Sequence, residues 1–219
     1  MIELKNISKR YSLGNGVTDA LSDIFLKIND GEFAAIMGAS GSGKSTLLNI
    51  IGCMDKPTSG EYFLDGRSVS QLNSRELAEL RREKITFVFQ NFALMEKYTA
   101  YENIELPLVN RNIPAKKRRE IVENSAARLG IADQLRKKPK QMSGGQQQRT
   151  ALARALASGA DIILADEPTG ALDKKNGIEL MEIFKALNED GKTIIIVTHD
   201  AATAEYADRI ITISDGRII

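Results

Sequence analysis

Cysteine, histidine and long apolar runs are scarce in this sequence, and each scarcity excludes a class of protein. The single cysteine, Cys53, cannot form an internal disulfide, which favours a reducing compartment, and we expect it to pack as a small buried hydrophobe. With one histidine in addition, no Cys/His cluster offers a metal site. The longest apolar runs, such as residues 33–37 and 194–197, are strand-sized and too short to span a bilayer. The N-terminus lacks the apolar stretch of a signal peptide, so we expect a cytoplasmic protein, or one that meets a membrane only through a partner.

Net charge is also nearly absent. Lys and Arg number 30 against 29 Asp and Glu, for a net charge of +1 at pH 7, so no global basic field points to nucleic acid. The 219 residues are 42% hydrophobic and 27% charged, which suits a globular domain with a substantial core. This length fits one large domain, or one domain with an inserted subdomain.

Short strand patterns alternate with helix patterns at both ends of the chain. Apolar/polar alternation over residues 21–28 predicts a half-buried strand. Asn73 followed by Glu76 predicts a capping box at a helix start, and Asp215-Gly216 predicts a tight hairpin turn. In all, the patterns predict strands at residues 21–28, 32–37, 61–64, 85–89, 162–165, 193–198 and 209–213, and helices at residues 44–53, 74–83, 145–157 and 174–188.

Between about residues 91 and 159 the strand signals disappear and helix signals dominate. Pro114 and Gly130 mark the start and the end of one predicted helix there. The layout is an α/β core interrupted by a helical insertion. We therefore expect one domain over residues 1–219, with a core formed by residues 1–90 and 160–219 and a helical subdomain formed by residues 91–159.

A glycine-rich loop between a predicted strand and a predicted helix carries the strongest local motif. Glycines let successive backbone N–H groups turn toward one anion, and the N-terminus of the following helix adds its positive dipole end. A lysine supplies a full charge to the β- and γ-phosphates, and the next hydroxyl is placed for Mg²⁺. The pattern G-x-x-x-x-G-K-[ST] is matched in full by Gly38-Ala39-Ser40-Gly41-Ser42-Gly43-Lys44-Ser45.

Two acids end the predicted strand over residues 162–165. A buried strand that delivers a carboxylate beside a phosphate-binding loop helps to hold Mg²⁺, a role that falls to Asp166. The second acid, Glu167, is placed to polarise an attacking water as a general base. Acids at strand ends are common on protein surfaces, so this interpretation depends on the upstream glycine-rich loop.

A third motif gives the family resemblance. Ser143-Gly144-Gly145-Gln146 is followed by Gln147-Gln148-Arg149 and a predicted helix. With this segment, the chain resembles the ATP-binding cassette (ABC) ATPases over residues 2–219, and its motifs come in the order of that family. The resemblance implies an α/β fold in which a P-loop NTPase core carries an antiparallel β subdomain and an inserted α-helical subdomain.

The resemblance also implies a role for each motif residue. Lys44, Glu167 and His199 are expected to be catalytic, with His199 contacting the γ-phosphate and orienting the attacking water. Tyr11 matches the aromatic residue that stacks on adenine, and Asp173 lies in the D-loop, Ala171-Leu172-Asp173. ATP is expected to bind Tyr11, Gly38, Ala39, Ser40, Gly41, Ser42, Gly43, Lys44, Ser45, Thr46 and Gln90, and Mg²⁺ is expected at Ser45, Gln90 and, through water, Asp166.

The signature segment Ser143–Gln146 predicts a second copy of the chain as a partner. It forms another helix N-terminus preceded by small residues, a surface that can bind a γ-phosphate from the side opposite to the loop. The inserted helical region carries it away from its own loop, so the resemblance implies that it acts on the ATP of another copy. Two chains related by a two-fold axis would then enclose two ATP molecules.

The segment after Gln90 indicates a membrane partner. Residues 91–108 are similar to the MacB/LolD/FtsE group, which dock there onto FtsX-like permeases, so we expect an ATPase on the inner face of the membrane, held there by a permease. Met142 replaces the leucine common before the signature, and residues 94–97 lack the proline often found there. The sequence stops after the hairpin at Asp215-Gly216, which leads us to expect a separate subunit or an excised cassette.

Two other functions stay open from the motifs. One is an FtsE-like regulatory ATPase that switches a cell-envelope complex without moving a substrate. The other is a soluble ABC ATPase that acts on DNA or ribosomes, although those usually carry long insertions or tandem cassettes. We expect no nucleic acid partner.

Overall fold

Two β-sheets form the framework of the protein, shown as a computed structural model that describes residues 1–13 and 16–219. The first sheet has the strand order β2-β1-β4-β5 and is antiparallel. The second has the order β10-β9-β3-β8-β7-β6 and is parallel apart from the β9–β10 hairpin. The strands are β1 (Ile2–Leu13), β2 (Gly16–Ile28), β3 (Phe33–Met37), β4 (Ser59–Leu64), β5 (Arg67–Ser68), β6 (Ile85–Phe89), β7 (Ile162–Asp166), β8 (Thr193–Thr198), β9 (Arg209–Ser214) and β10 (Arg217–Ile218).

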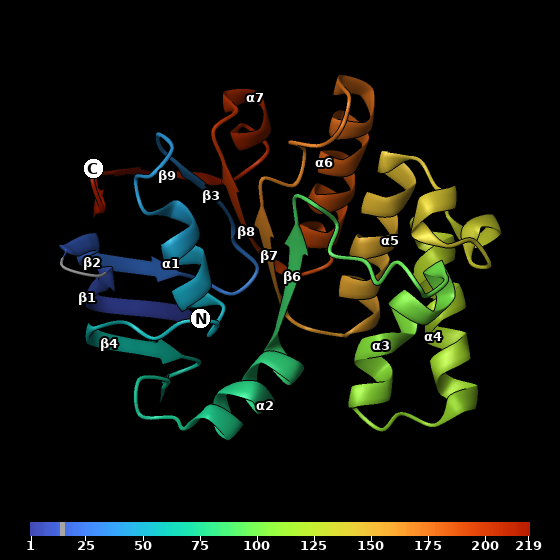
Figure 1. Cartoon of the computed structure of the whole chain (residues 1–219), viewed down its shortest axis with the longest axis horizontal. Coiled ribbons are helices and arrows are strands. Elements are labelled where there is room, and N and C mark those ends of the chain that lie inside the picture. Colours follow the sequence, from blue (N-terminus) through green and yellow to red (C-terminus); the bar gives the residue numbers. More distant parts are fainter. Residues whose placement is uncertain (14–15) are drawn as a thin grey trace.

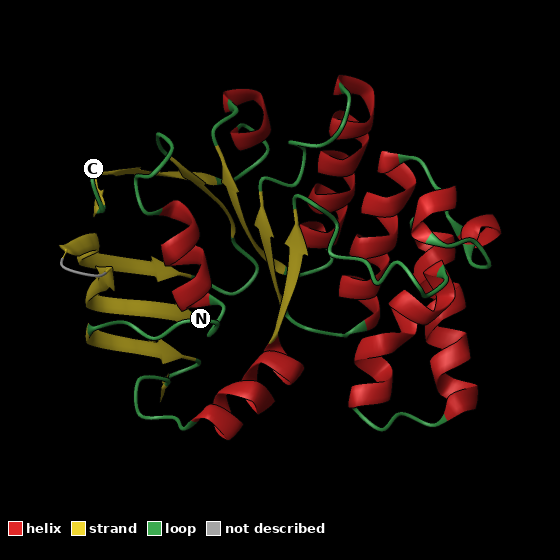
Figure 2. Ribbon diagram, viewed as in Figure 1, coloured by secondary structure: helices red, strands yellow, loops and turns green. Residues whose placement is uncertain are grey.

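The helices fall into groups around the two sheets. In Figure 1, α1 lies beside β1 and β2, whereas α3, α4 and α5 gather at the opposite end of the molecule. Figure 2 shows this end as almost entirely helical. Among the described residues, no helix is long and apolar enough to cross a membrane. The helices are α1 (Lys44–Ile51), α2 (Ser74–Lys84), α3 (Ala100–Asn110), α4 (Ala115–Arg128), α5 (Gly144–Ala157), α6 (Lys174–Glu189) and α7 (Ala201–Ala204), with short 3-10 turns at Ala132–Gln134 and Pro139–Gln141.

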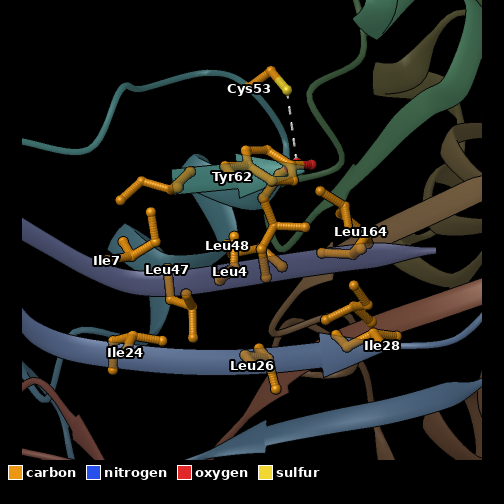
Figure 3. Packing of buried hydrophobic residues seen from close by; sticks show 14 of the residues in the cluster. Leu4, Ile7, Ile24, Leu26, Ile28, Leu47, Leu48, Cys53, Tyr62 and Leu164 are labelled. Carbon is orange, nitrogen blue, oxygen red and sulfur yellow. Dashed lines mark hydrogen bonds between the residues drawn. The ribbon is translucent and has the colours of Figure 1, made fainter. Parts of the chain in front are cut away.

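The parallel sheet is covered on both faces, which produces two hydrophobic cores. Successive side chains of a strand point to opposite faces. In β7, Leu164 joins a core shared with the antiparallel sheet and α1, whereas Ile163 joins a core with the helical end. Figure 3 shows Leu164 in this first core together with Leu4 of β1 and Leu48 of α1. Because both faces are covered, β8 is buried along its whole length.

Local capping explains where several helices begin. Asn73 and Glu76 form the predicted capping box at the start of α2, with Asn73 Oδ1 accepting from the Arg75 and Glu76 N–H groups. Thr99 with Glu102 caps α3 in the same way, and Ser143 with Gln146 caps α5. Each box satisfies N–H groups that a helix start leaves without an intrahelical partner.

The α/β class and the predicted elements are confirmed, with shifts of a few residues at their ends. The predicted helix over residues 44–53 ends at Ile51, because the chain leaves the helix at Gly52 and Cys53 has a positive φ of 56°. The predicted helix over residues 145–157 begins one residue earlier, at Gly144. Pro114 is the N-cap of α4 and Gly130, with φ 66°, follows its end, as predicted. The hairpin at Asp215-Gly216 joins β9 to β10.

Candidate functional site

The carboxyl ends of three parallel strands bring the predicted site residues together. Met37 pairs with Thr198, and Asp166 pairs with Val197, so β3, β7 and β8 end at one edge of the sheet. The chain continues from these ends into the glycine-rich loop, to Glu167 and to His199 respectively. Parallel α/β sheets bind ligands at this edge.

The glycine-rich loop is held against neighbouring strands so closely that two of its glycines leave no room for a side chain. Gly43 has φ 104°, and a Cβ there would lie 2.5 Å from the carbonyl oxygen of Ala20. A Cβ on Gly38 would lie 2.2 Å from the Ile213 carbonyl oxygen. The loop therefore depends on glycine both for its backbone conformation and for its close approach to β2 and β9.

Lys44 is buried at the bottom of this loop. Its ammonium donates to the carbonyls of Gly38 (2.8 Å) and Ala39 (2.7 Å), which are its acceptors among the described residues. An ammonium has three N–H donors, so one remains for an anion. Lys44 thus supports the loop and places a positive charge under it.

Ser45 and Asp166 place two oxygen atoms next to Lys44. Ser45 Oγ lies 3.5 Å from Asp166 Oδ1. Burial raises the pKa of Asp166, the neighbouring Glu167 adds to this shift, and Ser45 and Lys44 oppose it. A cation bound at this carboxylate would favour its ionised form.

Glu167 and His199 form a pair beside the loop. His199 Nδ1 lies 2.7 Å from Glu167 Oε1. The side chain of Glu167 is 17% exposed and that of His199 is 73% exposed, so the acid is sheltered while the imidazole remains open to a ligand. Glu167 has a positive φ of 46°, which costs free energy in a residue with a Cβ, and such strain concentrates at functional sites. Its backbone is fixed, since its N–H donates to the Val197 carbonyl at 2.9 Å.

These residues line one open pocket of about 620 Å³. Part of its wall comes from β2, a contribution that the motifs did not predict. This contact joins segments far apart in the sequence, and no local pattern marks it. Among the described residues, the lining consists of Thr18, Asp19, Ala20, Ser40, Gly41, Gly43, Lys44, Ser45, Thr46, Asp166, Glu167, Val197 and His199.

Five predicted nucleotide contacts lie outside the lining of the pocket: Gly38, Ala39 and Ser42 of the glycine-rich loop, together with Tyr11 and Gln90. The Tyr11 hydroxyl donates to Asp55 at 2.7 Å and also lies beside the Thr46 hydroxyl, which does line the pocket. The amide of Gln90 lies over Gly170, since a Cβ there would be 2.8 Å from its Nε2. Tyr11 is therefore a neighbour of the pocket, and Gln90 follows Phe89, which pairs with the pocket residue Asp166.

The signature segment Ser143–Gln146 is also outside the pocket and faces the D-loop instead. A Cβ on Gly144 would contact Ala171 and Leu172, and one on Gly145 would lie 2.6 Å from Asn176 Oδ1. Asp173 caps α6 by accepting from the N–H of Asn176 at 3.0 Å. Within one chain, the signature therefore does not complete the pocket around Lys44.

Arg154 ties the signature helix to the segment after Gln90, and the motifs did not single it out. Its guanidinium donates to the carbonyls of Ala93 (2.6 Å) and Phe92 (3.1 Å). Both residues have positive φ angles, 63° at Phe92 and 45° at Ala93. Burial lowers the pKa of Arg154. No local sequence signal marks this contact, because it joins residues about 60 positions apart.

Comparison with known proteins supports the same family as the motifs. The family model for the ABC transporter matches residues 21–170, well over half of the chain. The chain belongs to the ABC transporter family. This ABC cassette is 50% identical over its whole length to the macrolide export ATP-binding/permease protein MacB 1/2 of Paracoccus denitrificans, and 51% identical to MacB of Vibrio parahaemolyticus. It spans about a third of the length of these curated relatives, 33% and 34%.

Solved structures confirm the fold of the cassette. The dimeric structure of MJ0796, a bacterial ABC transporter cassette, matches with a TM-score of 0.93 at 49% identity, over 100% of this chain and 96% of that one. A dimeric post-hydrolysis state of MJ0796 bound to ADP and Pi matches with the same TM-score at 48% identity, with the same coverage. The predicted ABC ATPase fold and family are therefore confirmed.

Proposed function

We propose that this cassette binds and hydrolyses ATP, and that it forms a functional transporter with a second copy of itself and a membrane permease. The observation that carries the proposal is the Glu167–His199 pair, set beside a complete phosphate-binding loop at one edge of the sheet. The structure of MJ0796 with ADP and Pi, at 48% identity, supports hydrolysis as the reaction.

In this proposal, residues 38–46 hold the phosphates. The backbone N–H groups of the loop and of the first turn of α1 bind the phosphate oxygens, and the free N–H donor of Lys44 reaches the β- and γ-phosphates. Tyr11 stacks on the adenine from beside Thr46. Gln90, near the strained turn at Glu167, contacts the γ-phosphate side of the nucleotide.

The oxygen atoms near Lys44 fit Mg²⁺. Among the described residues there is no group of three or more His, Cys, Asp or Glu side chains for an all-protein metal site. Mg²⁺ usually takes one or two protein oxygens together with phosphates and water, and Ser45 and Asp166 offer such a pair. We assign them, with Gln90, to the metal. When bound, Mg²⁺ neutralises charge on the β- and γ-phosphates.

Glu167 acts as the general base in this proposal. Its sheltered carboxylate accepts a proton from the attacking water, while His199 orients that water and contacts the γ-phosphate. Lys44 stabilises the charge that develops on the transferred phosphoryl group. The catalytic residues are thus Lys44, Glu167 and His199.

A second copy supplies the signature segment. Ser143–Gln146 begins α5 beside the D-loop of its own chain, outside the pocket around Lys44. A two-fold partner can present this helix N-terminus to the γ-phosphate across an interface that includes Asp173. The dimeric state of the MJ0796 cassette, which has the same fold, supports this arrangement.

The permease docks on the helical subdomain, residues 91–159, which we distinguish from the core of residues 1–90 and 160–219. Two large hydrophobic residues after Gln90 are exposed, Met95 and Tyr98. A neighbouring pocket between α3, α4 and the following turns is lined by charged groups of both signs, including Glu102 and Arg136. The relatives named as ATP-binding/permease proteins for macrolide export support transport rather than a purely regulatory role. In this proposal the permease holds the cassette at the inner face of a membrane.

Substitution of the proposed base tests the hydrolysis step. We expect Glu167→Gln to keep ATP binding but to lower ATP turnover by about 10²- to 10⁴-fold, because the amide cannot accept the proton. Phosphate release is measured at saturating ATP, together with the dissociation constant for ATP. Glu61→Gln, at an exposed position on β4, serves as the matched control. Turnover of Glu167→Gln equal to that of the control would exclude the base role.

A further inference from the structure

We infer that Asp55 is a positioning residue for the nucleotide base: it fixes the ring of Tyr11 and the ammonium of Lys9 in one arrangement and anchors both to the helix that follows the phosphate loop. This inference rests on the proposed ATP site. It concerns a residue outside the glycine-rich loop and outside the lining of the pocket.

Asp55 uses its two carboxylate oxygens for two different partners. Oδ2 accepts from the Tyr11 hydroxyl at 2.7 Å, and Oδ1 accepts from Lys9 Nζ, also at 2.7 Å. The N–H of Lys56 donates to Oδ1 as well. Although burial opposes it, these hydrogen bonds hold the pKa of Asp55 below its usual range, so the carboxylate stays ionised near neutral pH.

Lys9 packs its ammonium against one face of the Tyr11 ring. Its ammonium lies 4.8 Å from the centre of the Tyr11 ring, within the range of a cation–π contact, and also donates to the Lys56 carbonyl at 2.7 Å. The side chain of Lys9 is only 12% exposed. With one face of the ring occupied by this ammonium, the opposite face is the one available to a base.

Asp55 connects Tyr11 to α1 through hydrogen bonds. Its N–H donates to the carbonyl of Asn49 in α1 at 3.2 Å. At the other end of the same helix, the Thr46 hydroxyl lies beside the Tyr11 hydroxyl. Tyr11 is therefore tied at its hydroxyl to the helix whose first turn faces the phosphates, which fixes the distance between the base platform and the phosphate site.

Comparing the binding of ADP with that of inorganic pyrophosphate distinguishes this positioning role from a general structural role. Pyrophosphate has no base, so a residue that positions the base should affect ADP binding only. We expect Asp55→Ala and Tyr11→Phe each to weaken ADP binding by about three- to tenfold through the lost hydrogen bonds. Binding of Mg²⁺-pyrophosphate should stay within about twofold of the unsubstituted chain. Both dissociation constants are measured by calorimetry on the 219-residue chain, with Glu61→Gln as the control and thermal unfolding as a check on folding.

A double-mutant comparison makes the test specific to the contact. In the Tyr11→Phe background, Asp55→Ala should cost less ADP affinity than it does alone, because the shared hydrogen bond is already gone. Fully additive losses, an equal loss of pyrophosphate binding, or unchanged ADP binding would each overturn the inference. Different results would contradict the proposed ATP site itself. In that case Tyr11→Ala would leave ADP binding unchanged, and Lys44→Ala would leave pyrophosphate binding unchanged.

Discussion

Cys53 shows how burial sets the chemistry of a single side chain. It is 4% exposed, and its thiol lies in the core near Tyr62 (Figure 3). The Tyr62 hydroxyl donates to the Ile51 carbonyl at 2.7 Å. Burial raises the pKa of the Cys53 thiol to about 11, against small opposing effects of Tyr62 and Arg81. The thiol is therefore neutral across the physiological pH range.

The raised pKa predicts that the Cys53 thiol is alkylated slowly in the folded chain. With a pKa of about 11, roughly one thiol in a thousand is ionised at pH 8, whereas an unfolded chain has a cysteine pKa of about 8.5. Since the raised pKa belongs to the folded state, unfolding should increase the rate of alkylation by iodoacetamide at pH 8 by at least about 100-fold. The rate is measured with and without urea. Similar rates in the two conditions would contradict the buried, neutral thiol.

Residues within local motifs could be placed from the sequence, and residues whose partners lie far away could not. Lys44, Ser45 and Glu167 follow strands whose ends were recognisable, so their meeting at one edge follows from the parallel sheet. The partner of Tyr11, Asp55, lies 44 positions along the chain. Nothing in the local pattern of either residue indicates that contact.

Among the elements, α5 joins two parts of the cassette. Its start is set by the Ser143–Gln146 box, which is a local signal, so its N-terminus was predicted to within one residue. Ten residues further on, Arg154 holds the Phe92 and Ala93 carbonyls. The ring of Phe92 also lies near Gly144, where an added Cβ would be 3.8 Å from Phe92 Cζ. The segment after Gln90 thus bonds to α5 through Arg154 and approaches its N-terminal end at Gly144.

Removal of the Arg154 guanidinium should destabilise this connection. We expect Arg154→Met to lower the free energy of unfolding by about 1–3 kcal/mol, because it removes the donors to two carbonyls in a left-handed turn while keeping most of the apolar stem. Arg75→Met, at an exposed position in α2, is the matched control and should change stability by less than about 0.5 kcal/mol. Urea denaturation measures both. A loss for Arg154→Met no larger than that of the control would contradict the connection.

The long strands of the antiparallel sheet were harder to predict than α5. β1 pairs with β2 through register shifts after Leu4, Ile7 and Lys9, so its apolar residues do not follow a simple alternation. In β2, the apolar/polar alternation predicted only the buried part, residues 21–28, whereas the strand extends from Gly16. The wall that β2 adds to the pocket depends on these irregular pairings.

At the scale of the whole molecule, the two sheets and the helical end place the phosphate loop and the signature helix at separate sites. α1 carries the loop beside the antiparallel sheet, whereas α5 begins beside the D-loop at the other side of the parallel sheet (Figure 1). The alternation of strand and helix patterns predicted the layers, and the loss of strand signals after residue 90 predicted the helical end.

ATP-dependent assembly of the hydrolysis-blocked chain tests the central claim most directly. Sedimentation equilibrium of Glu167→Gln should show a monomer without nucleotide and a dimer with Mg²⁺-ATP at one ATP per chain, because each signature helix then contacts the γ-phosphate held by the other copy. Addition of Ser143→Arg to that variant should keep ATP bound but prevent the dimer. A chain that binds one ATP and remains a monomer at protein concentrations of about 100 μM, well above a micromolar dissociation constant, would contradict the account.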